Sequence, residues 1–198
     1  MDQYIINESC VFNKVKEQWG ELSNMSNQYG VVIGGTKIKN TEALYQACRF
    51  PDFPDYQAEI LKGHSGMASK MTSKKYRKLY TRADWHDVRV EVMDFCLRLK
   101  FYQNSVFIKR ILNEVGGRDI VEKSHKDQLW GAVEQNGILI GDNTLGKLWM
   151  NIRDEIDTLI GPPEFNISNF KLLNKIITVE ACTLAKDRKL GQIDIFGG

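Results

Sequence analysis

The sequence predicts a single α+β domain that is rich in helices and carries a small β-sheet. Two stretches, 84–102 and 142–159, repeat apolar residues at the spacing of amphipathic helices. Short apolar runs beside glycines, such as 31–33, are typical of strands. A chain of 198 residues can bury one sizeable core and is too short for two comfortable ones, so we expect one domain over residues 1–198.

The elements expected before residue 80 are short and bounded by turn residues. Strands are expected within 1–20, and a hairpin over 31–39 turns at Gly34-Gly35. Helices are expected from Asn40 or Thr41 to the residue before Pro51, over 55–61 and over 65–71.

The second half of the chain alternates longer helices with short strands. The expected elements, in order, are a helix over 84–102, a helix over 104–113, a strand over 119–122, a polar loop over 123–130, an apolar run over 138–140, a helix over 142–159 that ends before Gly161, and a helix over 170–184 before a glycine-ended tail.

Composition narrows the class of protein. With 42% hydrophobic and 26% charged residues, the chain is typical of a globular protein. The start has no signal-peptide pattern, and no apolar run approaches the ~18 residues of a membrane span. The four cysteines are far apart and form no CxxC motif, so we expect reduced, buried thiols and no metal site. We therefore expect a cytoplasmic protein without membrane association.

The stretch 41–50 has two faces. Ala43, Leu44, Ala47 and Phe50 recur on one side of a helix, while Glu42, Gln46 and Arg49 line up on the other. One interpretation is a surface helix with a solvated polar stripe. The other is that the stripe faces a cleft where Glu42 takes part in proton chemistry. Periodicity leaves both open.

The net charge is only +2, but basic residues are concentrated in one segment. Between Glu59 and Asp84 there is no acidic residue, and the basic ones are Lys62, His64, Lys70, Lys74, Lys75, Arg77, Lys78 and Arg82. This segment, 62–82, favours either a phosphate-bearing partner such as nucleic acid or a solvated basic face.

Two further signals are individually weak. Gly146 lies in the first turn of the helix expected from 142, where N–H groups of Asn143 and Thr144 could hold a phosphate, or where glycine permits close packing. Asp127, close before Trp130, fits either a capped turn or the wall of a site.

Several ordered motifs resemble those of one family. They are Trp19-Gly20-Glu21-Leu22-Ser23-Asn24, Thr41 to Phe50, Asp84-Trp85, Lys100-Phe101 with Gln103-Asn104, Ile120-Val121-Glu122, Lys126 to Gly131, and Gly141 to Gly146 running on to Met150 and Arg153. Together they resemble the NADAR family, also called YbiA-like. The resemblance covers roughly 19–156 and leaves 162–198 as a C-terminal extension.

The resemblance implies an N-glycosidase that needs no metal or organic cofactor. Its implied substrates are ADP-ribosylated guanine in DNA or RNA, which would place the chain in nucleic-acid repair, or phosphorylated intermediates of riboflavin synthesis. The implied catalytic residues are Glu42, Lys70 and Asp127, with Lys70 forming an imine and Lys100 as the alternative lysine. The implied substrate-binding residues are Asn24, Gln46, Arg49, Trp85, Lys100, Trp130, Asn143 and Gly146.

The chemistry of N-glycoside hydrolysis agrees with these residue types. The reaction needs an acid for the leaving nitrogen and a group that stabilises or traps the sugar carbon. A lysine amine can form an imine with an opened sugar, and Lys74, Lys75 and Arg77 would lower its pKa if they come close to it. A non-catalytic module that binds ADP-ribose or a nucleotide remains the other class of function. The expected partner is an ADP-ribosylated nucleic acid or nucleotide, with contact through the segment 62–82, and the oligomeric state is open.

Overall fold

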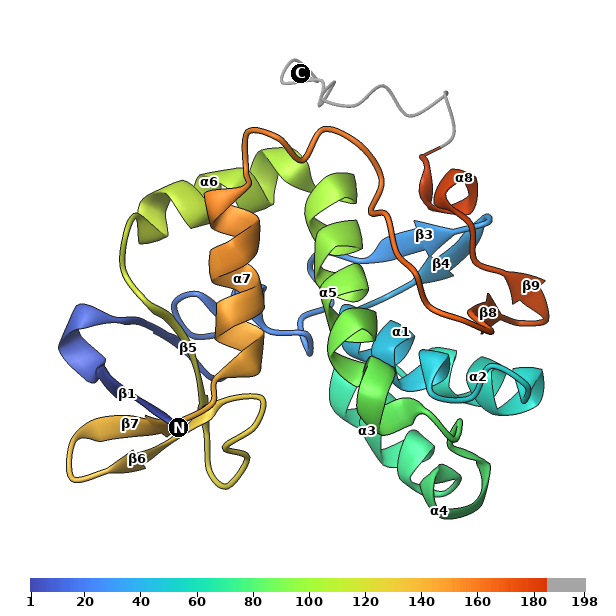
Figure 1. Ribbon diagram of the computed structural model, residues 1–198, viewed down its shortest axis with the longest axis horizontal. Helices are drawn as coiled ribbons and strands as arrows, with labels where there is room; N and C mark the ends of the chain where they lie inside the picture. The colour runs from blue at the N-terminus through green and yellow to red at the C-terminus, as the bar shows by residue number, and fades with distance from the viewer. Residues whose placement is uncertain (185–198) are drawn as a thin grey trace, which may run out of the picture.

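A mixed five-stranded sheet forms one side of the molecule (Figure 1). The computed structural model describes residues 1–184, so the expected glycine-ended tail lies outside the described residues. The strand order is β1-β7-β6-β5-β2, with strands β1 (Asp2–Ile5), β2 (Cys10–Phe12), β5 (Ile120–Ser124), β6 (Ala132–Gln135) and β7 (Ile138–Gly141). Strand β7 is antiparallel to β1 and β6, whereas β5 is parallel to β6 and β2.

Helices make up most of the rest. They are α1 (Thr41–Cys48), α2 (Pro54–Leu61), α3 (Gly66–Lys74), α4 (Arg77–Tyr80), α5 (Trp85–Gln103), α6 (Ser105–Val115), α7 (Thr144–Asp154) and α8 (Val179–Cys182). The predicted α+β class is confirmed, as is the hairpin of β3 (Val31–Ile33) and β4 (Thr36–Ile38), whose turn uses positive φ at Gly34 and Gly35.

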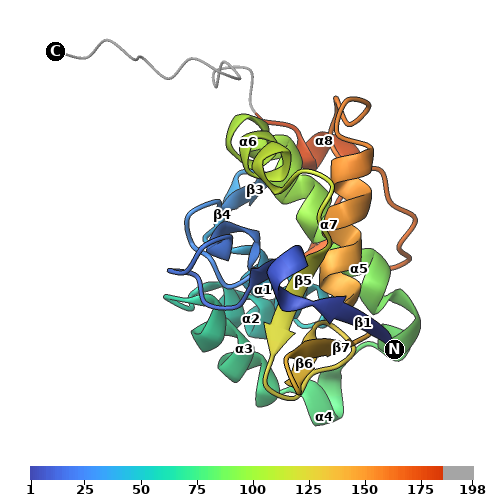
Figure 2. The ribbon, with the colours of Figure 1, turned by 90° about the vertical axis from the view of Figure 1, so that its left-hand side faces the viewer.

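The layers run from the sheet through α7 and α5 to α1. Helix α7 packs on β5 and on α5, and α5 in turn packs on α1 (Figure 1). Helices α2 and α3 cover α1 on its other sides. Helix α6 lies at the end of the molecule opposite the β6–β7 hairpin and α4 (Figure 2). Helix α1 is therefore enclosed by other elements, so its polar residues cannot form a solvated surface.

The helix predicted over 142–159 ends earlier than expected. Helix α7 stops at Asp154, although Ile156 and Leu159 still pack against the core. The chain continues in hydrogen-bonded turns, with the Leu159 amide donating to the Glu155 carbonyl (3.2 Å). The apolar spacing therefore persists beyond the regular helix, which is why the pattern predicted too long an element.

The helix predicted over 170–184 is wrong. The segment forms a two-stranded hairpin, β8 (Lys171–Leu172) with β9 (Lys175–Ile176), followed by the short α8. Leu173 and Asn174 both take positive φ, of 50° and 64°, and so make the turn between the strands. Positive φ interrupts a right-handed helix, and an apolar run alone does not reveal it.

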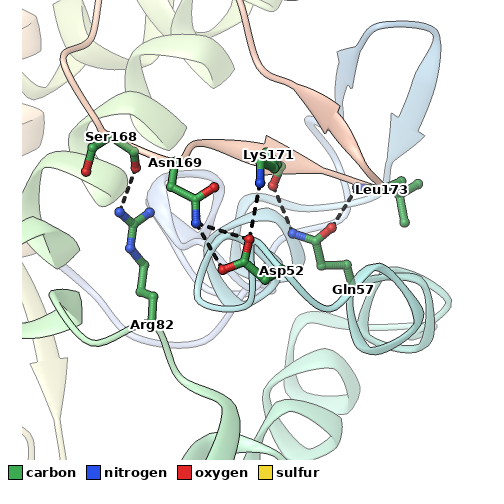
Figure 3. A network of polar contacts seen from close by, with 7 residues as sticks. All are labelled: Asp52, Gln57, Arg82, Ser168, Asn169, Lys171 and Leu173. Carbon is green, nitrogen blue, oxygen red and sulfur yellow. Dashed lines mark hydrogen bonds and ion pairs between the residues drawn. The ribbon is translucent and has the colours of Figure 1, made fainter.

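Polar contacts tie this C-terminal hairpin to α2 (Figure 3). The buried Gln57 donates to the Lys171 carbonyl (2.9 Å) and accepts from the Leu173 amide (2.6 Å). Asp52 accepts from Asn169 (3.0 Å) and pairs with Lys171 (3.2 Å). Part of the predicted C-terminal extension is thus built into the core of the molecule.

Besides β8 and β9, two other short elements were not predicted. Helix α4 lies within the basic segment, and β6 is a half-exposed strand of only four residues. Strand β6 turns into β7 through Asn136-Gly137, both at positive φ, which is the commonest two-residue hairpin signal.

The four cysteines are buried and free, as predicted. Within residues 1–184, no helix combines the length and the apolar character needed to cross a membrane.

Candidate active site

Helix α1 is buried along its whole length. Asn40 caps it by accepting from the Ala43 amide (2.8 Å), and all eight residues of the helix are buried. Even Glu42 is only 5% exposed and Gln46 only 3%. The interpretation of a solvated surface stripe is therefore wrong, and the polar stripe faces a cavity instead.

The cavity has a volume of about 200 Å³ and receives side chains from α1, α3, α5, β5 and the loop after β5. The predicted site residues that line it are Asn24, Glu42, Gln46, Arg49, Lys70, Asp127 and Trp130. The structure thus brings together residues that are up to about a hundred positions apart in the chain. Their chemical roles stay predictions.

Glu42 is held in a chain of hydrogen bonds. Its Oε1 accepts from Gln46 (2.9 Å), and Oε1 of Gln46 accepts from Ser73 (2.8 Å) and Arg77 (3.0 Å). Burial raises the pKa of Glu42, while the charges of Lys70 and Arg77 act in the opposite direction. Glu42 is therefore a buried carboxyl group at the cavity wall with a cationic side chain near it.

Glu122 is a site residue that the sequence interpretation missed. It lies on β5 and lines the same cavity. Burial, with the charges of Glu42 and Asp127, raises its pKa to about 7, against the opposing charge of Lys70. A signal existed, because Glu122 ends the apolar run Ile120-Val121 on the strand leading to the Asp127 loop.

Asp127 satisfies both interpretations offered for it. Its Oδ1 accepts from the amides of Leu129 (3.1 Å) and Trp130 (3.0 Å), which fixes the turn. The side chain also lines the cavity. Trp130 forms the adjoining wall and packs edge-on against Tyr45, with ring centroids 5.6 Å apart.

Lys100 does not lie at the cavity. It is fully buried, and its Nζ donates to the backbone carbonyls of Glu21 and Ser23 (3.2 Å to the latter). Burial lowers its pKa to about 7. Its place in the core makes it a support for the 21–24 segment, which corrects its prediction as the alternative covalent lysine and as a substrate contact.

Trp85 also lies outside this cavity. It is buried against Tyr45, and the guanidinium of Arg49 lies 4.5 Å from its ring centroid. Trp85 instead lines a neighbouring cavity, described below.

Asn143 and Gly146 do not form the predicted phosphate site. The Asn143 side chain accepts from the Glu122 amide (3.1 Å) and donates to the Ile120 carbonyl (2.8 Å). The amides of Asn143 and Thr144 donate to loop carbonyls of 129–131, so they are not free to bind an anion. A side chain at Gly146 would overlap the Ile120 carbonyl, so glycine permits α7 to pack on β5. Both residues position Glu122.

The basic segment 62–82 is divided among different environments. Lys70 and Arg77 line the cavity, and Arg82 is buried in an ion pair with Asp84 (2.6 Å). Lys75 pairs with Glu59 (2.7 Å). Lys62, Lys74 and Lys78 remain exposed, so only part of the segment forms a basic surface.

The arrangement is suited to acid–base chemistry around an amine. Glu42, Glu122 and Asp127 surround the cavity that Lys70 enters. No group of three or more His, Cys, Asp or Glu side chains in residues 1–184 is arranged to hold a metal ion.

Comparison with known proteins places this geometry in context. A sequence model of the NADAR domain matches residues 11–157. The chain is 28% identical over 156 residues to N-glycosidase YbiA of Escherichia coli (strain K12), covering 78% of this chain and 92% of that protein. It is 30% identical over 152 residues to an N-glycosidase of Nostoc punctiforme, with 75% and 93% covered.

Two further matches extend the comparison. The chain is 33% identical over 152 residues to a riboflavin biosynthesis protein of Vibrio vulnificus, covering 77% of this chain. It spans only 40% of that relative's length. The NMR structure of E. coli YbiA superposes with a TM-score of 0.62 at 25% identity, covering 76% of this chain and 87% of that one.

Proposed function

Because the chain belongs to the NADAR family, in which relatives are named N-glycosidases, we propose that it removes ADP-ribose from ADP-ribosylated guanine in DNA or RNA. The reaction replaces the bond between the ribose anomeric carbon and a guanine nitrogen with a bond to oxygen from water.

The observation that carries this proposal is the convergence of Glu42, Glu122 and Lys70 on one cavity. A module that only binds ADP-ribose needs cations for the phosphates and has no use for buried carboxyl groups beside an amine, because desolvating them costs free energy. The raised pKa of Glu122, about 7, suits a group that gives and takes a proton near neutral pH. An enzyme is therefore favoured over a binding module.

The proposed mechanism uses Lys70 as a covalent nucleophile. A protonated carboxyl of Glu42 or Glu122 gives its proton to the ribose ring oxygen, and the ring opens to an iminium between the anomeric carbon and the guanine nitrogen. The Lys70 amine adds to that carbon. Its proton passes to the guanine nitrogen, which leaves as its bond to carbon breaks, and a lysine imine remains.

Water completes the cycle. A carboxylate takes a proton from water as the oxygen adds to the imine carbon, and the bond from carbon to Lys70 then breaks. The sugar is released as an aldehyde that closes again to its ring, and the amine of Lys70 is regenerated. Asp127, held by its turn, would orient the sugar hydroxyl groups or the attacking water.

Phosphorylated intermediates of riboflavin synthesis are the second candidate substrates. The observation in their favour is the 33% identity to the riboflavin biosynthesis protein of Vibrio vulnificus. The exposed Lys62, Lys74 and Lys78 favour the polyanionic substrate instead, because a small metabolite does not need charges outside the cavity.

The proposal is tested by offering both substrates. ADP-ribosylated DNA and a phosphorylated riboflavin intermediate are incubated separately with the protein, and mass spectrometry follows released ADP-ribose or ribose 5-phosphate. Release of ADP-ribose that is lost in the Lys70→Ala variant supports the proposal. Release from the riboflavin intermediate alone would change the substrate, and intact substrates in both reactions would overturn the catalytic role.

A further inference from the structure

A second cavity, with a volume of about 490 Å³, lies beside the first. Its walls carry four arginines, Arg49, Arg77, Arg82 and Arg89, together with Trp85 and His86. Arg49 and Arg77 line both cavities, so the two cavities adjoin at these side chains. None of the described residues that line the second cavity is acidic.

The arginines have unused hydrogen-bonding capacity. Nε of Arg49, Nη1 of Arg82 and Nε of Arg89 are buried and find no partner within residues 1–184. Buried N–H donors of this kind are rare in folded proteins, because leaving the hydrogen bond of a charged group unmade is destabilising. All three atoms belong to arginines that line the second cavity, so the guanidinium groups around this cavity keep hydrogen-bonding capacity that the described residues do not use.

Ion pairing inside the protein compensates only part of the charge. Arg82 pairs with Asp84 (2.6 Å) and donates to the Ser168 carbonyl (2.7 Å; Figure 3), and Arg77 donates to Ser73 and Gln46. No ion pair is found for Arg49 or Arg89 among the described residues. Burial and the nearby charge of Arg77 lower the pKa of Arg49 to about 10.

The first cavity is too small to hold a large substrate by itself. The first, at about 200 Å³, is smaller than the ~300–1,000 Å³ of typical sites for drug-sized ligands. It can receive a sugar ring but not a whole dinucleotide-like molecule, so the rest of such a substrate must lie in an adjoining space.

We propose that the arginine-lined cavity binds the diphosphate group of a substrate whose ribose occupies the first cavity, a proposal that rests on the function proposed above. Guanidinium groups bind phosphate oxygens through paired hydrogen bonds. The four positive charges of these arginines exceed the negative charge of a single phosphate group. Arg49 and Arg77, shared by both cavities, would contact the phosphate nearest the sugar. The cavity would thus select a ribose diphosphate over a ribose monophosphate.

Direct binding tests the cavity without any turnover. Calorimetry with inorganic pyrophosphate and, separately, inorganic phosphate is carried out on the wild type and on Arg89→Gln, His86→Glu and Arg110→Gln. Arg89 and the exposed His86 line only the second cavity, whereas Arg110 is an exposed arginine on α6 and serves as the control. We expect pyrophosphate to bind more tightly than phosphate, and Kd to rise about tenfold in the first two variants but not in Arg110→Gln.

Kinetics link the cavity to the substrate. For ADP-ribosyl guanine, Arg89→Gln should raise KM about tenfold with kcat unchanged, and a ribosyl guanine without phosphates should not distinguish the variant from the wild type. Equal pyrophosphate affinity in wild type, Arg89→Gln and His86→Glu would overturn the proposal. If pyrophosphate binding depends on Arg89 but no N-glycoside is cleaved, the diphosphate site stands and the proposed function fails.

Discussion

Gln46 donates a hydrogen bond of 2.9 Å from its Nε2 to Oε1 of Glu42, one turn earlier on α1. The amide cannot turn around, because its oxygen accepts from both Ser73 and Arg77. The contact therefore connects α3 and α4 to the orientation of one buried carboxyl group. Because every side of α1 is covered, its polar residues bind one another and the neighbouring helices instead of solvent.

We predict that Glu42→Gln folds normally and loses about 100-fold or more in turnover. The amide keeps the shape and the acceptor for Gln46 but cannot exchange a proton. Because burial raises the pKa of Glu42, removing its charge should leave thermal stability unchanged or higher. Steady-state kinetics and thermal unfolding are measured beside Glu114→Gln, an exposed change on α6. Wild-type turnover in folded Glu42→Gln would remove Glu42 from the mechanism.

Glu122 predicts a pH dependence in activity. A carboxyl with a pKa of about 7 is protonated below that pH and ionised above it. If its acid form opens the sugar ring, the rate should fall as the pH rises through about 7. Glu122→Gln should be slower and should lack this limb of the profile. If the rate of Glu122→Gln still falls as the pH rises through about 7, another group is responsible for the titration.

The same residue predicts a pH dependence in stability. Glutamate in an unfolded chain has a pKa of about 4.3, below that of Glu122 in the native protein. Between about pH 4.3 and about pH 7 the native state binds the additional proton, so the free energy of unfolding should fall as the pH rises across this window. Above about pH 7 this contribution is constant. We expect the free energy of unfolding, measured by denaturant titration at several pH values, to fall less steeply with pH in Glu122→Gln than in the wild type.

The fold was largely predictable because most elements carry local signals. The caps Asn40 and Ser65 and the periodicity of 84–102 each specify a helix independently of the rest of the chain. The hairpin of β8 and β9 was not predictable, because its turn places Leu173 and Asn174 at positive φ and is bound by Gln57 of α2, which accepts from the Leu173 amide. Gln57 is more than a hundred residues away from this turn in the sequence, so no local pattern reveals the contact.

The site was partly predictable for the same reason. Glu42, Lys70 and Asp127 stand in recognisable motifs, and they reach one cavity. Whether a side chain faces that cavity depends on packing, which spacing does not encode. The sequence therefore did not show that Lys100 is buried in the core, away from the cavity, or that Glu122, which comes directly after the apolar Ile120 and Val121 in β5, faces the cavity.

The C-terminal hairpin should contribute to stability through Gln57. Replacing Gln57 with Leu removes the partners of the Lys171 carbonyl and the Leu173 amide. Leaving such groups unpaired costs roughly 1–3 kcal/mol each, so we expect the free energy of unfolding to fall by about 2 kcal/mol or more. Denaturant unfolding is compared with Gln135→Leu, an exposed position on β6. Equal stability of the two variants would mean that the hairpin is held by its apolar contacts alone.

The exposed lysines predict a dependence on the size of the substrate. Reversing Lys74 and Lys78 to Glu should weaken binding to ADP-ribosylated DNA and flatten its dependence on salt. Hydrolysis of an ADP-ribosylated nucleotide should change far less, because neither lysine lines the cavity. The control reverses Lys37 and Lys39, which are exposed near the β3–β4 hairpin and change the net charge equally. Similar losses on both substrates would show that 74–78 serves the fold instead.

The most specific prediction concerns Lys70. If its amine forms the imine, borohydride added during turnover should reduce that imine and leave a stable ADP-ribose adduct on the protein. Peptide mapping should place the adduct on Lys70, because this is the described lysine that lines the cavity with Glu42 and Glu122. Lys70→Ala should lose both adduct and activity. Lys70→Arg should be equally inactive, since a guanidinium stays protonated and cannot form the imine.

Lys100 provides the matched comparison for this experiment. It is the other lysine considered for the covalent step, and its pKa of about 7 would favour a neutral amine. Its Nζ is nevertheless committed to the carbonyls of Glu21 and Ser23 in the core. Lys100→Met should therefore lower stability but still give an adduct at Lys70. An adduct mapped to Lys100 would keep the imine mechanism and move its nucleophile, whereas an active Lys70→Ala variant without any adduct would exclude covalent catalysis by lysine.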